Sequence, residues 1–417
     1  MSEWKEVKLS DVSVLSTGFP FKGDLYSSEG IRVVRGDNVT IGELRWPKEK
    51  DKRWNEPFNR MVEFSLQEAD IVIGMDGSRV GYNRAQIKQS DLPLLIAQRV
   101  ACVRNNEKSL QSFLYYQIFS NQFTRYIRNI QTGSAIPHVS LKQIGDFKFQ
   151  IPSIETQRSI TSILSSLDDK IAVNRRICEN LEAQAQALFK HWFIDFAPFL
   201  DKPSGKAERK NGKFVESELG MIPEGWRVGR LEELGDIVGG ATPSKAEDSY
   251  YTSKGIAWLT PKDLSNKLSK FTSRGEIDLT QEGYNSCSAK LMPKGSVLFS
   301  SRAPIGYLTI AKNDICTNQG FKSVVPKYAG TAYIYYLLKT NTKRIESMSS
   351  GTTFKEASGS LMKSLAVIIP PKSIIDNYEA SVVEIFKEQE VIEDESSRLS
   401  TLRDTLLPKL MSGQIKV

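Results

Sequence analysis

The side chains that usually carry catalysis are few and scattered in this sequence. Its two histidines, His138 and His191, have no cysteine or second histidine at the spacing of a zinc site. No glycine-rich phosphate-binding loop is present. We therefore expect no metal site and no catalytic centre on this chain, which indicates a binding protein rather than an enzyme.

One stretch could suggest an enzyme. Asn55-Glu56-Pro57-Phe58 is faintly similar to the Asn/Asp-Pro-Pro-aromatic motif of amino-methyltransferases. Glutamate replaces the first proline of that motif, and no cofactor-binding glycine motif accompanies it. A catalytic nuclease or methyltransferase remains an alternative, but it would need an acidic metal site or a cofactor loop that the sequence does not contain.

The cysteines and the hydropathy pattern indicate the compartment. Four cysteines stand far apart without a CxxC pair, which is typical of reduced thiols. They are Cys102, Cys178, Cys287 and Cys316. The start, Met1-Ser2-Glu3-Trp4-Lys5, does not resemble a signal peptide, and no apolar run approaches the roughly 20 residues of a membrane helix. These features predict a cytoplasmic protein.

The residues best suited to binding are arginines and amides placed among turns. Arg35-Gly36-Asp37-Asn38 and residues 77–84 and 300–307 combine turn-forming residues with basic, amide or hydroxyl side chains. Arginine can bond guanine edges, asparagine or glutamine can bond adenine, and serine, threonine or lysine can hold phosphates. The net charge of +7 mildly favours a polyanionic partner. Each of these residues could equally be an ordinary solvated turn residue.

Double-stranded DNA is the partner that these turns suggest. Arg79 and Arg302 are the leading candidates for contact, since each shortly precedes a Gly-Tyr pair, Gly81-Tyr82 or Gly306-Tyr307. The full set of candidate DNA-binding residues is Arg35, Asn38, Arg79, Tyr82, Asn83, Arg84, Ser134, His138, Lys262, Ser301, Arg302, Tyr307, Thr352 and Lys355.

Much of the sequence occurs twice. Trp4-Lys5-Glu6-Val7-Lys8-Leu9 has a counterpart in Trp226-Arg227-Val228-Gly229-Arg230-Leu231, about 222 residues later. Further matches follow in the same order: Gly30-Ile31 with Gly255-Ile256, Leu114-Tyr115-Tyr116 with Ile334-Tyr335-Tyr336, and Thr132-Gly133-Ser134 with Ser350-Gly351-Thr352. One repeat of this length is too long for a solenoid unit and indicates a duplicated domain.

The first copy reads as an α+β domain. Short β-rich runs at Ile31-Arg32-Val33-Val34 and at residues 70–73 and 98–103 are followed or separated by turn residues. A helix is predicted from Leu110 to about Ile130, with an apolar stripe on one face. We expect the first domain over residues 1–152 and the second over residues 226–371, with a linker at 199–225.

Each domain is followed by a long helix, expected over residues 153–198 and 372–417. Apolar residues recur there in steps of four and three, which is the heptad seam of a coiled coil, and Asn174 is a polar position that would fix register. Pro408 is expected to kink or end the second helix. The expected helix-pairing residues are Ile160, Leu164, Leu167, Ile171, Asn174, Leu181, Leu188, Tyr378, Val382, Ile385, Leu399 and Leu406. A long amphipathic helix lying on a domain is the alternative.

We therefore expect an α+β fold of two duplicated domains joined by two long helices that pair with each other. Antiparallel pairing would place a pseudo-twofold axis between the halves. The domains would then lie at opposite ends of a coiled coil about 40 residues long, roughly 60 Å at 1.5 Å per residue.

The helices also carry a family resemblance. Leu167-Asp168-Asp169-Lys170-Ile171 and Trp192-Phe193-Ile194-Asp195-Phe196 resemble the central conserved region of type I restriction-modification specificity subunits. Leu402-Arg403-Asp404-Thr405-Leu406-Leu407-Pro408-Lys409-Leu410-Met411-Ser412-Gly413 resembles their distal conserved helix. Ile222-Pro223-Glu224-Gly225-Trp226 is similar to the start of their second target-recognition domain. The resemblance extends over essentially the whole chain.

The resemblance implies a division of labour. Two target-recognition domains would each read half of a split DNA sequence, and the helical pair would set the gap. A pair of DNA adenine methyltransferase subunits would dock on the helices and use S-adenosylmethionine. Motor-nuclease subunits that use ATP and Mg would be the further partners, so this chain itself would hold no cofactor. A stand-alone two-headed DNA-binding scaffold without enzyme partners is the other class of function.

Overall fold

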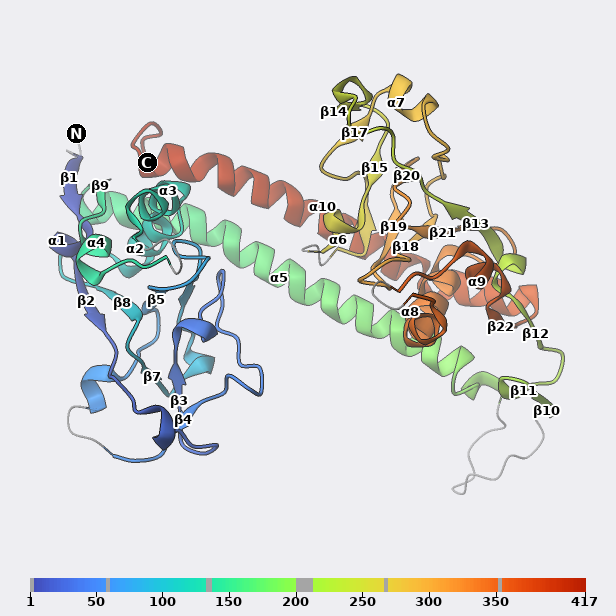
Figure 1. The fold of residues 1–417 in the computed structure, drawn as a ribbon, viewed down its shortest axis with the longest axis horizontal. Helices are drawn as coiled ribbons and strands as arrows, with labels where there is room; N and C mark the ends of the chain where they lie inside the picture. The colour runs from blue at the N-terminus through green and yellow to red at the C-terminus, as the bar shows by residue number, and fades with distance from the viewer. Residues whose placement is uncertain (1–3, 58–60, 133–136, 200–212, 266–268, 352–354) are drawn as a thin grey trace. The chain divides into compact units, whose positions relative to one another are not determined.

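The computed structural model of the protein describes residues 4–57, 61–132, 137–199, 213–265, 269–351 and 355–417 (Figure 1). Ser134 and Thr352, two of the candidate DNA-binding residues, lie outside the described residues. The chain forms two compact units, Met1–Ile171 with Arg398–Val417 (unit 1) and Ala172–Ser397 (unit 2). Among the described residues, every helix is too short or too polar to cross a lipid bilayer.

Unit 1 is built on small sheets. A four-stranded antiparallel sheet has the order β2-β8-β5-β6, and a three-stranded sheet has the order β4-β3-β7, in which β3 and β7 run parallel. Its strands are β1 (Lys5–Lys8), β2 (Ser13–Thr17), β3 (Ile31–Val34), β4 (Arg53–Trp54), β5 (Ile71–Gly74), β6 (Arg84–Gln86), β7 (Leu94–Ile96), β8 (Val100–Asn105) and β9 (Lys148–Ile151). Its short helices are α1 (Leu9–Val12), α2 (Gln111–Ile118), α3 (Asn121–Ile130) and α4 (Leu141–Gly145).

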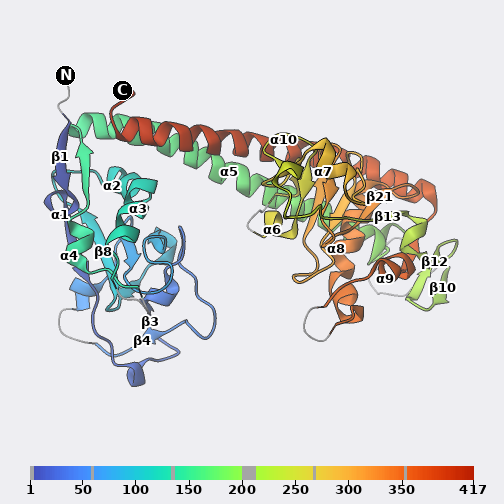
Figure 2. The same ribbon diagram turned by 45° about the horizontal axis from the view of Figure 1, so that its top comes forward.

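Alternation along β5 and β8 divides the core of unit 1 into two layers. Ile71 and Ile73 pack with Phe113 of α2 and Phe123 of α3, so the helices cover one face of the four-stranded sheet (Figure 2). Val72 lies between them in sequence and packs on the other face with residues of β3 and β7. This arrangement follows from the two-residue period of a strand.

The helix predicted from Leu110 to Ile130 is two helices, and the prediction was wrong at that point. The Ser120 hydroxyl accepts a hydrogen bond from Phe123 N at 3.1 Å, so Ser120 is the N-cap of α3. Serine favours such a cap over a helix interior. The apolar stripe continues on both sides of the break because both helices pack on the same sheet.

Unit 2 repeats this topology with longer and additional elements. Its main sheet has the order β13-β21-β18-β19-β16, and β15 and β20 pair in parallel. Its strands are β12 (Arg227–Arg230), β13 (Gly235–Gly239), β14 (Tyr251–Thr252), β15 (Trp258–Leu259), β16 (Phe271–Thr272), β17 (Asp278–Leu279), β18 (Val297–Phe299), β19 (Leu308–Ala311), β20 (Cys316–Thr317), β21 (Lys322–Pro326) and β22 (Ala366–Ile369). Its shorter helices are α6 (Pro261–Leu264), α7 (Gln281–Asn285), α8 (Thr331–Met348) and α9 (Gly359–Ser364). A hairpin of β10 (Phe214–Ser217) and β11 (Gly220–Pro223) lies within residues 199–225.

Strand register aligns the two units residue by residue. In unit 1, Val103 of β8 lies opposite both Leu15 and Ile71. In unit 2, Val324 of β21 lies in the same way opposite Ile237 and Val297. The pairs β1–β9 and β12–β22 correspond as well. The prediction of two duplicated α+β domains is therefore confirmed.

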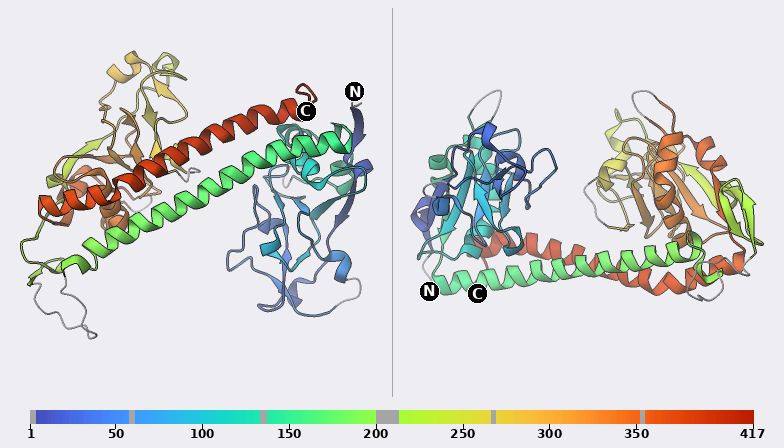
Figure 3. Two further views of the ribbon diagram at one scale, coloured as in Figure 1. Left: turned by 180° about the vertical axis from the view of Figure 1, so that it is seen from behind. Right: turned by 90° about the horizontal axis from the view of Figure 1, so that it is seen from below.

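Two helices of 40 residues each, α5 (Ile154–Phe193) and α10 (Lys372–Met411), carry the rest of the chain. In unit 2 they lie side by side (Figure 3), with Asn174 Nδ2 donating to Glu395 Oε2 at 2.7 Å and the Phe193 ring 5.0 Å from the Tyr378 ring. The contacts run in opposite sequence directions, so the pairing is antiparallel, as predicted.

The predicted seam faces inward, but it does more than join two helices. Every predicted pairing residue is buried or half-buried. Ile160 and Leu164 pack into the core of unit 1, while Tyr378 and Val382 pack into the core of unit 2. Both interpretations of the helices therefore apply, because the helices pair and the two ends of each helix also pack on the units to which they belong.

Two details of the helices differ from the prediction. Leu402 continues the heptad step of three from Leu399, but it is 46% exposed and does not belong to the buried seam. Of the two outcomes predicted at Pro408, a kink or an end, the end does not occur there, because helix α10 continues through Pro408 to Met411. Proline in a helix interior costs about 3 kcal/mol, and burial of Leu410 and Met411 in the unit 1 core offsets that cost.

Candidate nucleic-acid interface

In unit 1 the parallel strands β3 and β7 end side by side, and a cleft of about 570 Å³ opens where they end. Turns that follow the strands form its wall, because the carboxyl ends of parallel strands meet at one edge. We call it the first cleft. It is lined by Phe19, Pro20, Phe21, Tyr26, Arg35, Gly36, Asp37, Lys50, Asp76, Gly77, Ser78, Arg79, Asn83, Ala97, Gln98 and Arg99.

The first cleft is basic and partly aromatic. The Arg35 guanidinium lies 5.8 Å from the centre of the Tyr26 ring and 3.4 Å from Asp37. Arg79 is exposed, and its side chain makes no hydrogen bond or ion pair with any described residue. Arg99 adopts a positive φ of 71°, a strained conformation for a residue with a side chain, and lies 3.5 Å from Asp76. Cations and aromatic faces together suit phosphates and bases.

Asn38 was predicted to contact DNA, but it is fully buried. Its amide donates to the carbonyl oxygens of Arg45 and Lys50 at 3.1 Å, and its Oδ1 accepts from Arg35 N at 3.1 Å. Asn38 therefore shapes the turn that presents Arg35 instead of facing a ligand.

Arg84 is also a correction, because its side chain lies in the interior and is only 7% exposed as a residue. It donates to Gly81 O at 2.9 Å, to Phe119 O at 3.2 Å and to Thr124 Oγ1 at 2.8 Å. Burial lowers the pKa of Arg84 to about 10. The residue fastens the loop before β6 to α3, and sequence alone gave no sign of this, since arginine is rarely buried.

The remaining candidates of unit 1 are at or near the surface. Asn83 lines the first cleft, and exposed Tyr82 accepts a hydrogen bond from Arg128 Nη1 at 3.1 Å. His138 Nδ1 contacts the Asp76 carboxylate at the rim of the cleft. The structure thus brings Arg35, Arg79 and Asn83 together in one cleft, and it adds Gln98 and Arg99, which the sequence analysis missed.

Unit 2 has a cleft of about 560 Å³ where its parallel strands β15 and β20 end. We call it the second cleft. Lys262, a predicted residue, lines it and lies 3.4 Å from Glu276. Basic side chains are fewer here than in the first cleft, and acidic side chains outnumber them. The lining comprises Thr242, Lys245, Asp248, Tyr251, Trp258, Thr260, Pro261, Lys262, Asp263, Glu276, Ile277, Asn318 and Gln319.

Other predicted residues of unit 2 lie away from this lining. Ser301 is fully buried, so its predicted DNA contact was wrong. Tyr307 is half-buried against an apolar cluster, and Lys355 is exposed. Arg302 is exposed, but its Nε lies 3.0 Å from Glu356.

Strand register also corrects the pairing of Arg79 with Arg302. Ser301 N donates to Gly320 O and Met75 N donates to Arg99 O, so Ser301 corresponds to Met75. The next residues, Arg302 and Asp76, therefore correspond, as do their bridge partners Glu356 and His138. Each unit thus places a carboxylate beside a basic side chain at this position, with the two residue types exchanged between the two positions. The loop from Arg302 to Gly306 in unit 2 is shorter than the corresponding loop from Asp76 to Gly81 in unit 1. Arg79 therefore has no counterpart in unit 2.

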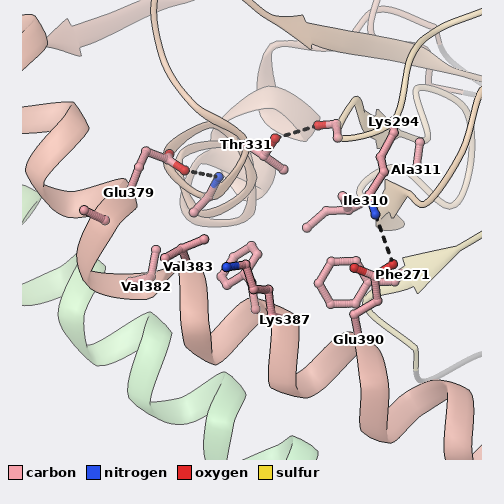
Figure 4. Close-up of a pocket in the computed structure, with 14 residues that line it drawn as sticks. Phe271, Lys294, Ile310, Ala311, Thr331, Glu379, Val382, Val383, Lys387 and Glu390 are labelled. Atoms are coloured by element: carbon pink, nitrogen blue, oxygen red, sulfur yellow. Dashed lines mark hydrogen bonds and ion pairs between the residues drawn. The ribbon is translucent and has the colours of Figure 1, made fainter.

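A third cavity of about 430 Å³ lies in unit 2 beside α10 (Figure 4). Glu379 accepts from Tyr333 N at 2.7 Å, and the Thr331 hydroxyl donates to Gly295 O at 2.8 Å. Glu379 thus caps the N-terminus of α8, and these polar groups fasten α10 to the domain. The apolar lining of this third cavity comprises Phe271, Ile310, Ala311, Val382, Val383 and Phe386. This lining does not suit a polyanion.

In each unit a tyrosine of the repeated Tyr-Tyr pair is bonded to a carboxylate on α5. Tyr116 OH donates to Asp168 at 2.8 Å, and Arg403 bonds the same carboxylate at 2.8 Å. Tyr336 OH lies 3.0 Å from Glu182. These bonds hold each domain, and therefore each cleft, on its helix.

Glu182 is the centre of a largely buried ion cluster. The Lys270 ammonium, 2% exposed as a side chain, contacts Glu182 and lies 4.2 Å from the centre of the Phe386 ring, and Lys339 contacts the same carboxylate. Burial alone would raise the pKa of Glu182, but the two lysines hold that pKa below its ordinary value. Burial lowers the pKa of Lys270.

Among the described residues, no group of three or more histidine, cysteine, aspartate or glutamate side chains is placed to hold a metal ion. The four cysteines are unpaired, and burial raises the pKa of Cys102 and of Cys316 to about 12.

Two duplicated units, each with a cleft where its parallel strands end, define a two-site binding protein. The family described as type I restriction modification DNA specificity domain matches residues 1–183 and 223–397. The chain therefore belongs to the family of type I restriction-modification DNA specificity subunits.

Individual relatives are similar over different lengths. The type I restriction enzyme HindI specificity subunit of Haemophilus influenzae is 27% identical over 471 aligned residues that cover 100% of both chains. The MjaIX specificity subunit of Methanocaldococcus jannaschii is 42% identical over 161 residues, which are 38% of this chain and 37% of that protein. The crystal structure of an S subunit from M. genitalium has a TM-score of 0.60 at 14% identity, covering 98% of this chain and 96% of that chain, and it shares the fold.

Proposed function

We propose that this chain reads a bipartite DNA sequence, with the first cleft contacting one half-site and the second cleft the other. The observation that carries the proposal is the presence of two clefts at register-equivalent strand ends with different chemistry. Two clefts that bind different DNA sequences need different side chains at the base edges, since these side chains specify the sequence. The two clefts share a backbone arrangement and differ in their side chains, as this requires.

We also propose that the chain is non-catalytic and works with enzyme subunits. The relatives are named specificity subunits of type I restriction enzymes, which supports this division. A pair of DNA adenine methyltransferase subunits would dock on α5 and α10, and motor-nuclease subunits could join them. S-adenosylmethionine, ATP and Mg would belong to those partners, and this chain would bind none of them.

Exchange of one domain tests the proposal directly. Residues 1–150 are replaced by the matching domain of a relative, and the variant is co-expressed with its methyltransferase partner. Mapping of methylated DNA should show one half of the recognised sequence changed and the other half retained. The matched control exchanges residues 226–371 and should alter the opposite half. A change of both halves in either variant contradicts modular reading.

A further inference from the structure

Two side chains are common to both clefts at the same register positions. Seven lining positions of the first cleft have register equivalents that line the second. Five of them differ: Pro20 and Thr242, Arg35 and Thr260, Gly36 and Pro261, Asp37 and Lys262, Ala97 and Asn318. The other two are the same in both units: tyrosine at Tyr26 and Tyr251, and glutamine at Gln98 and Gln319. The glutamines alone carry a side-chain amide, which can both donate and accept a hydrogen bond at a base edge.

The register of these glutamines is fixed on both sides. Ala97 N donates to Val34 O, and Asn318 N donates to Leu259 O, each at 2.9 Å at the end of a parallel strand pair. One residue beyond each glutamine, Arg99 O accepts from Met75 N at 3.1 Å, as Gly320 O accepts from Ser301 N at 2.8 Å. No insertion separates the two alignments, so Gln98 and Gln319 occupy the same place.

Both glutamines are presented outward from the same kind of turn. Val100 N donates to Ala97 O at 3.3 Å, and Phe321 N donates to Asn318 O at 3.3 Å, so each glutamine is the second residue of a tight turn. Both side chains are exposed. A solvated turn position places little demand on residue type, so folding alone does not require glutamine at both.

The chemistry of a neutral amide favours a base over a phosphate. Phosphates need donors and positive charge, and arginines and lysines at neighbouring positions already supply these. Glutamine offers a donor and an acceptor side by side, which match N7 and the N6 amino group of adenine in the major groove. In unit 2 the Thr242 hydroxyl donates to Gln319 Oε1 and so orients that amide, leaving Nε2 for a second partner.

We propose that Gln98 and Gln319 each read an adenine, and that the two adenines stand at corresponding positions of the two half-sites. The proposal rests on the proposed function, since it assigns one base contact to each cleft. The neighbouring lining positions, which carry different side chains in the two clefts, then account for the sequence differences between the half-sites. Thr242 is a positioning residue for Gln319, and proline at the corresponding position 20 has no hydroxyl to do the same for Gln98.

The test is selection of bound duplexes from a randomised DNA library by the full-length chain assembled with its methyltransferase partner. Gln98→Ala should reduce the preference for adenine at one position of one half-site by about tenfold or more, with the other half-site unchanged. Gln319→Ala should do the same at the corresponding position of the other half-site. Thr242→Val should weaken the preference at the Gln319 position, and Thr242→Ser should retain it.

Gln67→Ala and Gln281→Ala are matched controls, since both side chains are exposed and outside the cleft linings. Unfolding temperatures show that each variant is folded. The proposal is overturned if Gln98→Ala or Gln319→Ala weakens binding to all sequences and flattens its salt dependence, if the relaxed base is not adenine, or if preferences do not change. A wild-type chain that selects no bipartite sequence instead refutes the proposed function, before any variant is tested.

Discussion

Arg79 lies on the turn before β6, Arg84 is the first residue of β6, and the two have opposite surroundings. Arg79 is exposed in the first cleft and makes no side-chain bond with a described residue, while Arg84 makes three hydrogen bonds inside unit 1. A charged side chain on the surface of a cleft can contact DNA, whereas a buried guanidinium stabilises the fold. The same residue type therefore has two separable roles here.

We expect Arg79→Ala to weaken DNA binding without changing stability. A lost base contact should cost about 1–3 kcal/mol and relax one position, whereas a lost phosphate contact should weaken binding to all sequences and reduce the salt slope. Binding titrations at several salt concentrations distinguish the two. Arg84→Met is the contrasting variant and should lower the free energy of unfolding by about 2 kcal/mol, since it removes hydrogen bonds from a charged donor. Unchanged DNA binding in Arg79→Ala would show that Arg79 is an ordinary surface turn residue without a role in DNA binding.

Residue types in the sequence predicted only some of the residues that line the two clefts. Arg35, Arg79, Asn83 and Lys262 line the two clefts. Asn38 and Ser301 were chosen by the same rule and are buried. The Asn38 side chain closes its own turn, as short polar side chains after a strand often do. Burial depends on contacts from distant parts of the chain, so local sequence does not reveal it.

At the scale of elements, α5 is the support to which each domain is bonded. Its Asp168 and Glu182 bond the repeated tyrosines Tyr116 and Tyr336. The heptad pattern predicted this helix and its antiparallel partner, since the pattern is long and regular. It did not predict that α3 begins at the Ser120 cap or that α10 continues past Pro408, because packing against the domains outweighs local preference there.

We expect Glu182→Gln to destabilise unit 2 by about 3 kcal/mol at neutral pH, since it leaves buried Lys270 without its carboxylate. The pKa of Glu182 lies below its ordinary value of 4.5, so its stabilising effect is complete above that value and is lost as pH falls through the lower folded pKa. The difference in unfolding temperature between wild type and variant should therefore narrow below pH 4.5.

The comparison with the variant is needed because other carboxylates act in the opposite direction. Burial raises the pKa values of Glu379 and Glu393, and such groups favour the folded state more as pH falls through the raised pKa. The pH dependence of the total free energy of unfolding contains contributions of both signs. The difference between wild type and Glu182→Gln isolates the contribution of Glu182. A difference that stays constant from pH 7 to pH 3 would show that the Glu182 charge does not stabilise the fold.

At the scale of the whole molecule, the proposed division of labour predicts an inactive isolated chain. Pure protein incubated with labelled S-adenosylmethionine and double-stranded DNA should transfer no methyl group above a mock preparation. The same assay after addition of the methyltransferase partner is the positive control. Methyl transfer by the chain alone would contradict a non-catalytic role.

The long helices should also set the gap between half-sites. Asn174 donates a hydrogen bond to Glu395, so a heptad inserted beside Asn174 needs its matching heptad beside Glu395. Two such insertions keep the seam in phase and lengthen the helical pair by roughly 10 Å. DNA rises by about 3.4 Å per base pair, so we expect the gap to grow by at most about three base pairs.

A four-residue insertion in α5 alone is the contrasting variant, because it moves the seam out of phase and should weaken assembly with the methyltransferase partner. The measurement is methylation mapping for the double-heptad variant beside wild type. A flexible connection would let both proteins methylate the same sequence, since the domains could then adjust to the original gap. An active double-heptad variant that keeps the wild-type gap would therefore show that helix length does not determine spacing. A longer gap with both half-sites unchanged would assign spacing to the helices and base reading to the clefts.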